Sequence, residues 1–164
     1  MEFTQGVRFD SLGLSPEIMR AIAHRNLEVS TPVQAGCIPP MMAWQDVIAK
    51  APTGTGKTFA YGIPIVEHID PEDESVQAVI LAPTRELAIQ ITGELRDIAA
   101  FKPGVRSVCL YGGQPIGKQI DTLKKRPQIV VATPGRLSDH MKRRTVKVDA
   151  VQTVVLDEAD RMLD

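Results

Sequence analysis

Short runs of Val, Ile and Leu alternate with helix-patterned segments along this chain, and the alternation limits the fold more than any other feature. The runs are continuously apolar, which is typical of strands buried on both faces of a parallel sheet. Between two runs, Leu87, Ile91, Leu95 and Ile98 recur at helical spacing. We therefore predict an α/β fold, a parallel sheet with helices on both faces. Five strands are expected, within residues 46–50, 76–83, 106–113, 128–134 and 153–159.

Length, charge and cysteine content exclude several classes of protein. The 164 residues are the size of one domain, and their net charge of -1 gives no broad positive surface for coating nucleic acid. Any nucleic-acid site must therefore be local. Cys37 and Cys109 lie far apart, outside any metal-binding pattern, and no apolar run has signal-peptide or membrane-span length. We predict a cytoplasmic protein with no membrane partner.

Two helices are expected before the first strand. Ser15 followed by Pro16 has the pattern of a helix cap and a first helical residue, and a second helix is expected after the "STPVQ" of residues 30–34.

The segments that follow the expected strands are rich in Gly, Thr and charged residues. In an open parallel sheet, ligands bind beyond the carboxyl ends of the strands, so these segments should converge on one rim. They are "APTGTGKT" at 51–58, "APTREL" at 82–87, "YGGQ" at 111–114, "ATPGR" at 132–136 and "DEAD" at 157–160.

Residues 51–58 have the pattern of a phosphate-binding loop between a strand and a helix. Gly54 and Gly56 allow backbone N–H groups to face an anion, Lys57 can reach terminal phosphates, and the Thr58 hydroxyl can bind Mg²⁺. The usual first glycine of this loop is Ala51 here. The alternative is a glycine-rich turn with a surface lysine.

Acidic residues directly after a buried strand need a cation or a hydrogen-bond donor. Asp157 is predicted to hold Mg²⁺, partly through water, and Glu158 to orient an attacking water. The alternative is a helix N-terminus that favours acids through its dipole.

In their order, these segments resemble the motifs of the first RecA-like domain of DEAD-box ATP-dependent RNA helicases. The resemblance covers nearly the whole chain and implies a RecA-like sheet truncated before its last strands. It also implies an N-terminal helical segment with the glutamine motif at 1–45 and an ATP-binding core at 46–164, within one structural domain. The residues that carry it are Phe9, 30–34, 51–58, 83–88, 112–113, 133–136 and 157–160.

The resemblance implies a role for each motif. Phe9 would stack on adenine and Gln34 would read its edge, which selects ATP; without the family, Phe9 is a core residue and Gln34 a helix-cap residue. The ATP-binding set is Phe9, Thr31, Gln34, Ala51, Pro52, Thr53, Gly54, Thr55, Gly56, Lys57 and Thr58. Lys57, Asp157 and Glu158 would be catalytic, and Thr58 and Asp157 would hold Mg²⁺.

A groove for the sugar-phosphate backbone of single-stranded or duplex RNA is also implied, with little base readout. The RNA-binding set is Pro83, Thr84, Arg85, Gly112, Gly113, Thr133, Pro134, Gly135 and Arg136. Alternatively, Thr84 and Thr133 cap the helices that follow them and both arginines are solvated.

The chain departs from the family pattern in three ways. A Gly-aromatic pair is replaced by Asn26 and Leu27, and a common turn glycine is replaced by Trp44. The Ser-Ala-Thr motif and the second RecA-like domain are absent. We expect a fragment that binds adenine nucleotide weakly, turns ATP over negligibly and tends to self-associate through unpaired strand edges.

Two other functions remain open on the sequence. A stand-alone phosphate-loop NTPase, such as a nucleotide kinase, explains residues 51–58 and 157–160 but not Gln34 or the groove motifs. The other is a non-catalytic RNA-binding module.

Overall fold

The computed structural model describes residues 6–51 and 56–163. It divides into two compact units. The helical unit is Met1–His68 with Glu94–Pro103, and the sheet unit is Ile69–Gly93 with Gly104–Asp164. The boundary expected at residue 45 stays a prediction.

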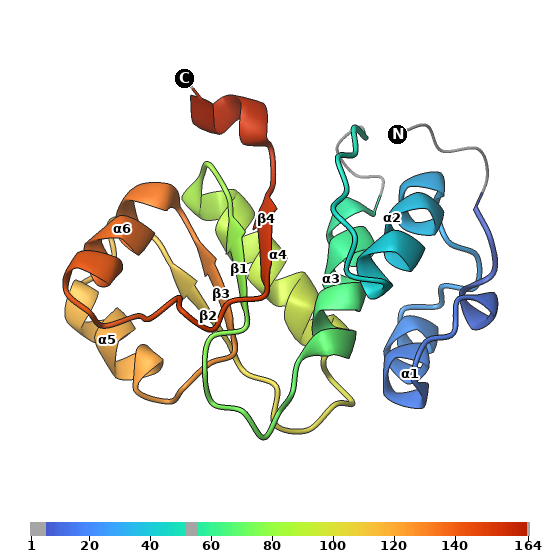
Figure 1. The fold of residues 1–164 in the computed structure, drawn as a ribbon, viewed down its shortest axis with the longest axis horizontal. Coiled ribbons are helices and arrows are strands. Elements are labelled where there is room, and N and C mark those ends of the chain that lie inside the picture. The colour runs from blue at the N-terminus through green and yellow to red at the C-terminus, as the bar shows by residue number, and fades with distance from the viewer. Residues whose placement is uncertain (1–5, 52–55, 164) are drawn as a thin grey trace. The chain divides into compact units, whose positions relative to one another are not determined.

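The helical unit contains a short 3-10 helix η1 (Phe9–Ser11) and the α-helices α1 (Pro16–His24), α2 (Pro32–Met42) and α3 (Lys57–His68) (Figure 1). Both predicted helices are confirmed, although α2 begins at Pro32, within residues 30–34 and not after them. The Ser15 hydroxyl caps α1 by accepting from the Ile18 N–H, and Pro16 is the first helical residue. Ser15 also donates from its hydroxyl and its backbone N–H to the Glu67 carboxylate, at 2.6 and 2.7 Å, which ties the start of α1 to α3.

Two positions where the family favours glycine have left-handed backbone here. Asn26 has φ 57° and Trp44 has φ 61°, and glycine is the residue that adopts such angles without steric cost. Asn tolerates this region, whereas Trp does not. The Trp44 ring stacks on His68, with centroids 3.8 Å apart, and this contact offsets part of the backbone cost.

The sheet unit contains a four-stranded parallel sheet in the order β2-β3-β1-β4. The strands are β1 (Ala78–Leu81), β2 (Ser107–Leu110), β3 (Ile129–Ala132) and β4 (Thr153–Leu156). The helices are α4 (Arg85–Ile98), which continues into the helical unit, α5 (Ile116–Leu123) and α6 (Pro134–Lys142), followed by the 3-10 helix η2 (Ala159–Leu163). The predicted α/β class and parallel sheet are confirmed.

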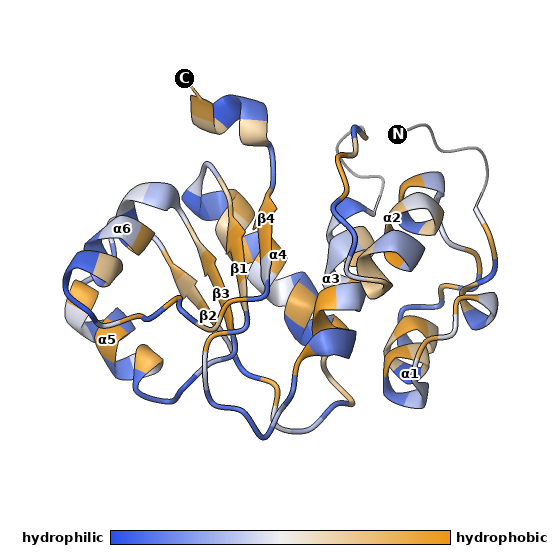
Figure 2. Ribbon diagram, in the orientation of Figure 1, coloured by the Kyte–Doolittle hydropathy of each residue, from blue (hydrophilic) through white to orange (hydrophobic). Residues whose placement is uncertain are grey.

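Helices cover both faces of the sheet, as expected. Val79, Val130 and Val108 lie in register on one face and pack with Leu123 of α5 and Leu137 of α6. Ile80 and Val131 are buried on the opposite face, where Figure 1 shows the first part of α4. Figure 2 shows the apolar strands between these polar-surfaced helices.

The helix predicted from the spacing of its apolar residues is confirmed as α4. Ile91, Leu95 and Ile98 are buried, whereas Leu87, near the start of the helix, is partly exposed.

The strand expected at residues 46–50 is wrong. These residues form no strand, and the Ile48 side chain is 83% exposed. A parallel strand requires backbone pairing with a neighbour, and the strand pairings of the described residues involve only β1 to β4. Local composition therefore favoured a strand that these residues do not form.

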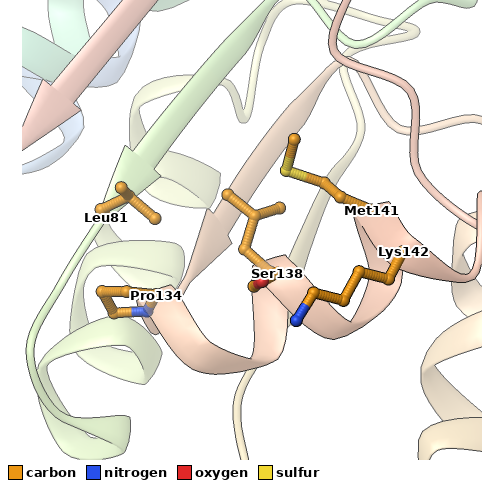
Figure 3. Close-up of a pocket in the computed structure, with 6 residues that line it drawn as sticks. Leu81, Pro134, Ser138, Met141 and Lys142 are labelled. Atoms are coloured by element: carbon orange, nitrogen blue, oxygen red, sulfur yellow. The ribbon is translucent and has the colours of Figure 1, made fainter.

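β4 is an edge strand with an exposed apolar face. Val154 and Leu156 are 60% and 55% exposed, although they lie in register with Val79 and Leu81 of β1. Beside Leu81, a cavity of about 370 Å³ opens against α6, lined by Pro134, Met141 and their neighbours (Figure 3). An edge of this kind favours association between chains, and self-association stays a prediction.

Among the described residues, every helix is too short or too polar to cross a membrane.

Candidate functional site

The phosphate-loop segment ends at the start of α3. Gly56 has φ 78°, Lys57 begins the helix, and the Thr58 side chain is buried. The Gly56 carbonyl accepts the Ala60 N–H at 3.1 Å, and Ala51 packs against an apolar cluster that includes Val33. The predicted residues Pro52, Thr53, Gly54 and Thr55 lie outside the described residues. The described part places Gly56 directly before the N-terminus of α3, the end of a helix whose N–H groups can face an anion.

Gln34 joins the start of α2 to the start of α3. Its side-chain oxygen accepts the Thr31 N–H at 2.8 Å, and its own N–H donates to the Thr31 hydroxyl at 3.3 Å, so the two residues form a capping box. Its side-chain nitrogen donates to the Gly56 carbonyl at 3.2 Å, and the residue is 4% exposed. The helix-cap alternative is confirmed. One N–H and one lone pair of the amide remain for another partner, so contact with adenine stays a prediction.

Phe9 begins η1, next to an isolated antiparallel bridge between Arg8 and Val29. Its N–H donates to the Glu28 carbonyl at 3.1 Å, and Val7 and Ser30 exchange hydrogen bonds next to it. The Phe9 side chain is 1% exposed, as its alternative role as a core residue requires. Stacking on adenine stays a prediction.

The acidic segment turns sharply at the carboxyl end of β4. The Asp157 N–H donates to the Leu81 carbonyl at 2.9 Å, and its side chain is buried. Glu158 has φ 51° and its carboxylate accepts from Arg161 at 3.1 Å. Strained backbone of this kind persists where the surrounding structure holds it, often at functional sites.

Oxygen donors from Thr58 and Asp157 suit Mg²⁺, which prefers hard oxygen ligands and keeps several waters. Within residues 6–51 and 56–163, no group of three or more His, Cys, Asp or Glu side chains is arranged to hold a metal. Thr58 belongs to the helical unit and Asp157 to the sheet unit, and the metal-binding role of each stays a prediction.

Two predicted groove segments meet at the carboxyl ends of β1 and β2. The Thr84 hydroxyl accepts the Leu87 N–H at 3.2 Å, which confirms Thr84 as a cap of α4. The exposed Arg85 guanidinium lies 5.3 Å from the Tyr111 ring centroid. A Cβ atom at Gly113, which has φ 92°, would lie 3.9 Å from the Arg85 Nη1. Residues 83–85 therefore lie beside 112–113, with Pro83 partly buried and Gly112 exposed.

The third groove segment, residues 133–136, lies next to the second, because Arg136 contacts Gln114. Residues 83–85, 112–114 and 133–136 are together called the strip. The Thr133 N–H donates to the Leu110 carbonyl at 3.0 Å, and its hydroxyl makes no capping bond although Thr133 occupies the cap position of α6. Arg136 donates to the Gln114 carbonyl at 3.1 Å, and its side chain is only 15% exposed. The solvated alternative is therefore wrong for Arg136. Pro134 and Gly135 remain exposed at the helix start.

Two polar residues under this strip belong to no motif in the sequence. Gln119 is 1% exposed and His140 is fully buried. His140 Nε2 lies 2.7 Å from the Gln119 side-chain oxygen, and its Nδ1 lies 2.8 Å from the Thr145 hydroxyl. A single glutamine in α5 and a single histidine in α6 carry no recognisable sequence signal, so only tertiary structure brings them together.

Burial lowers the pKa of His140 below its ordinary value, and Arg136 and Arg143 lower this pKa further, while Asp139 opposes them. The folded chain therefore favours the neutral ring, whereas the unfolded chain has the usual histidine pKa of about 6.5. The unfolded chain binds more protons below that pH. The contribution of His140 to the free energy of unfolding is therefore full above that pH and falls as the pH drops, by up to about 1.4 kcal/mol per pH unit.

We expect urea unfolding to show that the free energy of unfolding falls more between pH 7.5 and pH 5.5 in the wild type than in His140→Gln. Equal losses would contradict this.

Three comparisons with known proteins are consistent with one another. A family model described as "DEAD/DEAH box helicase" matches residues 31–164. The chain is 52% identical over 158 residues to the DEAD-box ATP-dependent RNA helicase CshA of Bacillus licheniformis, covering 96% of this chain and 32% of that protein. It is 53% identical over 156 residues to the CshA protein of Geobacillus kaustophilus, covering 95% of this chain and 33% of that protein.

Among solved structures, the chain matches the crystal structure of a DEAD box protein from the hyperthermophile Methanococcus jannaschii. The TM-score is 0.90 at 38% identity, covering 98% of this chain and 44% of that one. The chain spans about a third of the length of the curated relatives it matches.

Proposed function

This chain belongs to the DEAD/DEAH box helicase family, and on that premise we propose that it is the first RecA-like domain of an ATP-dependent RNA helicase. In this role it binds ATP with Mg²⁺ and the backbone of single-stranded RNA. Within a longer parent protein, a second RecA-like domain closes on it. RNA bent by that closure cannot stay paired, and hydrolysis resets the enzyme.

One observation carries the RNA part of the proposal. The segments 83–85, 112–114 and 133–136 come from three separate places in the chain, yet they form one strip at the carboxyl ends of β1, β2 and β3. The strip presents an exposed guanidinium, exposed glycines and helix N-termini, which are the donors that bind phosphate oxygens without reading bases.

The nucleotide part of the proposal rests on the start of α3 and on Gln34. The Lys57 ammonium binds the terminal phosphates, and the free hydrogen-bonding capacity of the Gln34 amide reads adenine. The hydrogen bond from Gln34 to the Gly56 carbonyl supports this role, because the same side chain can then contact both the adenine base and the phosphate loop. Mg²⁺, when bound, would supply charge neutralisation for phosphoryl transfer. Thr58 and Asp157 would help to hold it, and Glu158 would orient the attacking water.

The cytoplasm is the proposed location, and the expected partners are RNA, the second domain and, through the β4 edge, further copies of this chain. The chain alone is expected to turn over ATP negligibly, because an arginine from a second domain contributes about 10³ to 10⁵ in rate in related phosphate-loop chemistry.

Equilibrium binding tests the proposal. We expect a fluorescent ATP analogue to bind this chain about tenfold more tightly than the matching GTP analogue. We expect fluorescein-labelled oligouridine to bind with strong salt dependence, because phosphate contacts release counterions. Lys57→Ala should weaken only nucleotide binding, and Arg85→Ala only RNA binding. Arg96→Ala, at an exposed position of α4, is the matched control and should change neither.

The rival functions predict different results. Equal binding of ATP and GTP with no RNA binding would favour a stand-alone phosphate-loop NTPase. RNA binding without nucleotide binding would favour a non-catalytic RNA-binding module, and RNA-stimulated hydrolysis at whole-enzyme rates would contradict the two-domain requirement.

A further inference from the structure

We propose that Gln119 is a positioning residue for RNA binding, because its buried side-chain amide holds the 111–114 turn and Arg136 in one arrangement. The inference rests on the proposed function and deepens it. Gln119 lies on α5 and belongs to none of the three groove segments, so it does not itself contact RNA.

The Gln119 amide uses its full hydrogen-bonding capacity on four partners, of which three are Tyr111, Gln114 and Arg136. Its nitrogen donates to the Tyr111 carbonyl at 2.8 Å and to the Gln114 side-chain oxygen at 3.0 Å. Its oxygen accepts from His140 at 2.7 Å and from Arg136 at 3.4 Å. A primary amide offers two N–H donors and two lone pairs, so all four are used.

The surrounding groups fix which way the amide faces. The Tyr111 carbonyl can only accept, so the Gln119 nitrogen must face it, and Arg136 can only donate, so the oxygen must face Arg136. The opposite orientation would set acceptor against acceptor and donor against donor in a buried site, at the cost of several unsatisfied groups. The His140 ring then donates from Nε2, while its Nδ1 meets the Thr145 hydroxyl. The amide therefore has one orientation.

This geometry couples two RNA-binding segments. The Gly112–Gly113 turn is held from one side by the amide nitrogen, through Tyr111 and Gln114. Residues 133–136 are held from the other side by the amide oxygen, through Arg136, which also donates directly to the Gln114 carbonyl. Glycine turns have many accessible conformations, so an external restraint is needed to keep their N–H groups aimed at successive phosphates.

The effect of removing the amide should be local to this strip. Gln119→Met keeps a similar volume but leaves the Tyr111 carbonyl, the Gln114 side chain, Arg136 and His140 without their shared partner. Stability will fall, and so will the order of residues 111–114. Thr92→Val is the matched control, because it removes a buried hydroxyl that donates to the Ala88 carbonyl at 2.8 Å in α4, away from the strip.

The experiment compares wild type, Gln119→Met and Thr92→Val in this chain. The readouts are thermal unfolding, affinity for fluorescein-labelled oligouridine, affinity for a fluorescent ATP analogue, and hydrogen exchange of the 111–114 amides. For Gln119→Met we expect RNA affinity to fall about tenfold, ATP affinity to stay within about twofold, and exchange to speed up at 111–114. Thr92→Val should lose stability with no change in RNA affinity or in exchange at 111–114.

Gln114→Ala supplies the same test in case Gln119→Met does not fold. Gln114 is only half-buried, so its truncation removes one Gln119 partner with little risk to the core. We expect faster exchange at residues 111–113 and weaker RNA binding.

Folded Gln119→Met and Gln114→Ala variants with wild-type RNA affinity would overturn the inference and leave the proposed function standing. Equal losses of RNA and ATP affinity would also overturn it, because they would indicate a general structural role. A wild-type chain that binds nucleotide but no RNA would overturn the RNA part of the proposed function and the inference together.

Discussion

Gly56→Ala should destabilise the helical unit and abolish nucleotide binding. Gly56 has φ 78°, and an added Cβ would collide with the Gln34 side-chain nitrogen. A left-handed alanine costs about 1 to 2 kcal/mol, and moving Gln34 would also break the capping box, so we expect a total loss near 3 kcal/mol. Thermal unfolding of a domain of this size should shift down by about 6 to 12 °C.

Gly93→Ala is the matched control for this variant. Gly93 lies in α4, and a Cβ there would meet nothing within 4 Å. Alanine is the better helix former, so this change should stabilise the chain by about 0.5 to 1 kcal/mol. Nucleotide affinity, measured with the fluorescent ATP analogue, should not change. A Gly56→Ala chain with wild-type stability and nucleotide affinity would show that the contact between Gln34 and Gly56 does not form in solution.

Gln34→Glu should have the second largest effect on stability and nucleotide binding. The change keeps the shape of the side chain and replaces only its NH₂ group by an oxygen. The carboxylate can still accept the Thr31 N–H, but the atom that donates to the Gly56 carbonyl becomes an oxygen facing an oxygen. The site is buried, so a charge and an unsatisfied carbonyl together should cost about 2 to 4 kcal/mol. We also expect ATP affinity to fall and the preference for ATP over GTP to disappear.

Urea unfolding and nucleotide binding measure this result. Gln45→Glu makes the same chemical change at an exposed position of the same unit and should be close to neutral. If Gln34→Glu lost ATP affinity with full stability, Gln34 would act on the base alone and the link to Gly56 would be unimportant. If it lost stability but kept its preference for ATP, the adenine role would be contradicted.

The course of the chain followed from local patterns. Continuous Val and Ile runs marked four of the strands, because a strand buried on both faces has no polar side to alternate with. The Ser15-Pro16 pair and residues 30–34 marked the starts of α1 and α2, because helix caps are local hydrogen bonds. The ordered motifs also indicated the family, which the comparisons confirm.

The assignments that failed depended on partners distant in sequence. Residues 46–50 have the composition of a strand, but a strand forms only with a neighbour to bond, and none of the described strands pairs with them. The Arg136 side chain could be solvated on local grounds. Two of its partners, Gln114 and Gln119, lie 22 and 17 residues away.

The sequence by itself determined the class of fold, the family and the four segments that follow β1 to β4, since these depend on periodicity and on short motifs. That residues 51–58 join them stays a prediction. Tertiary structure alone decided how those segments are held. It joined the Gln34 side chain to the Gly56 carbonyl, and it gave the buried Gln119 amide hydrogen bonds to Tyr111, Gln114, Arg136 and His140. The physical reason is that a buried polar group must find its partners in space, and their positions in the sequence give no sign of the pairing.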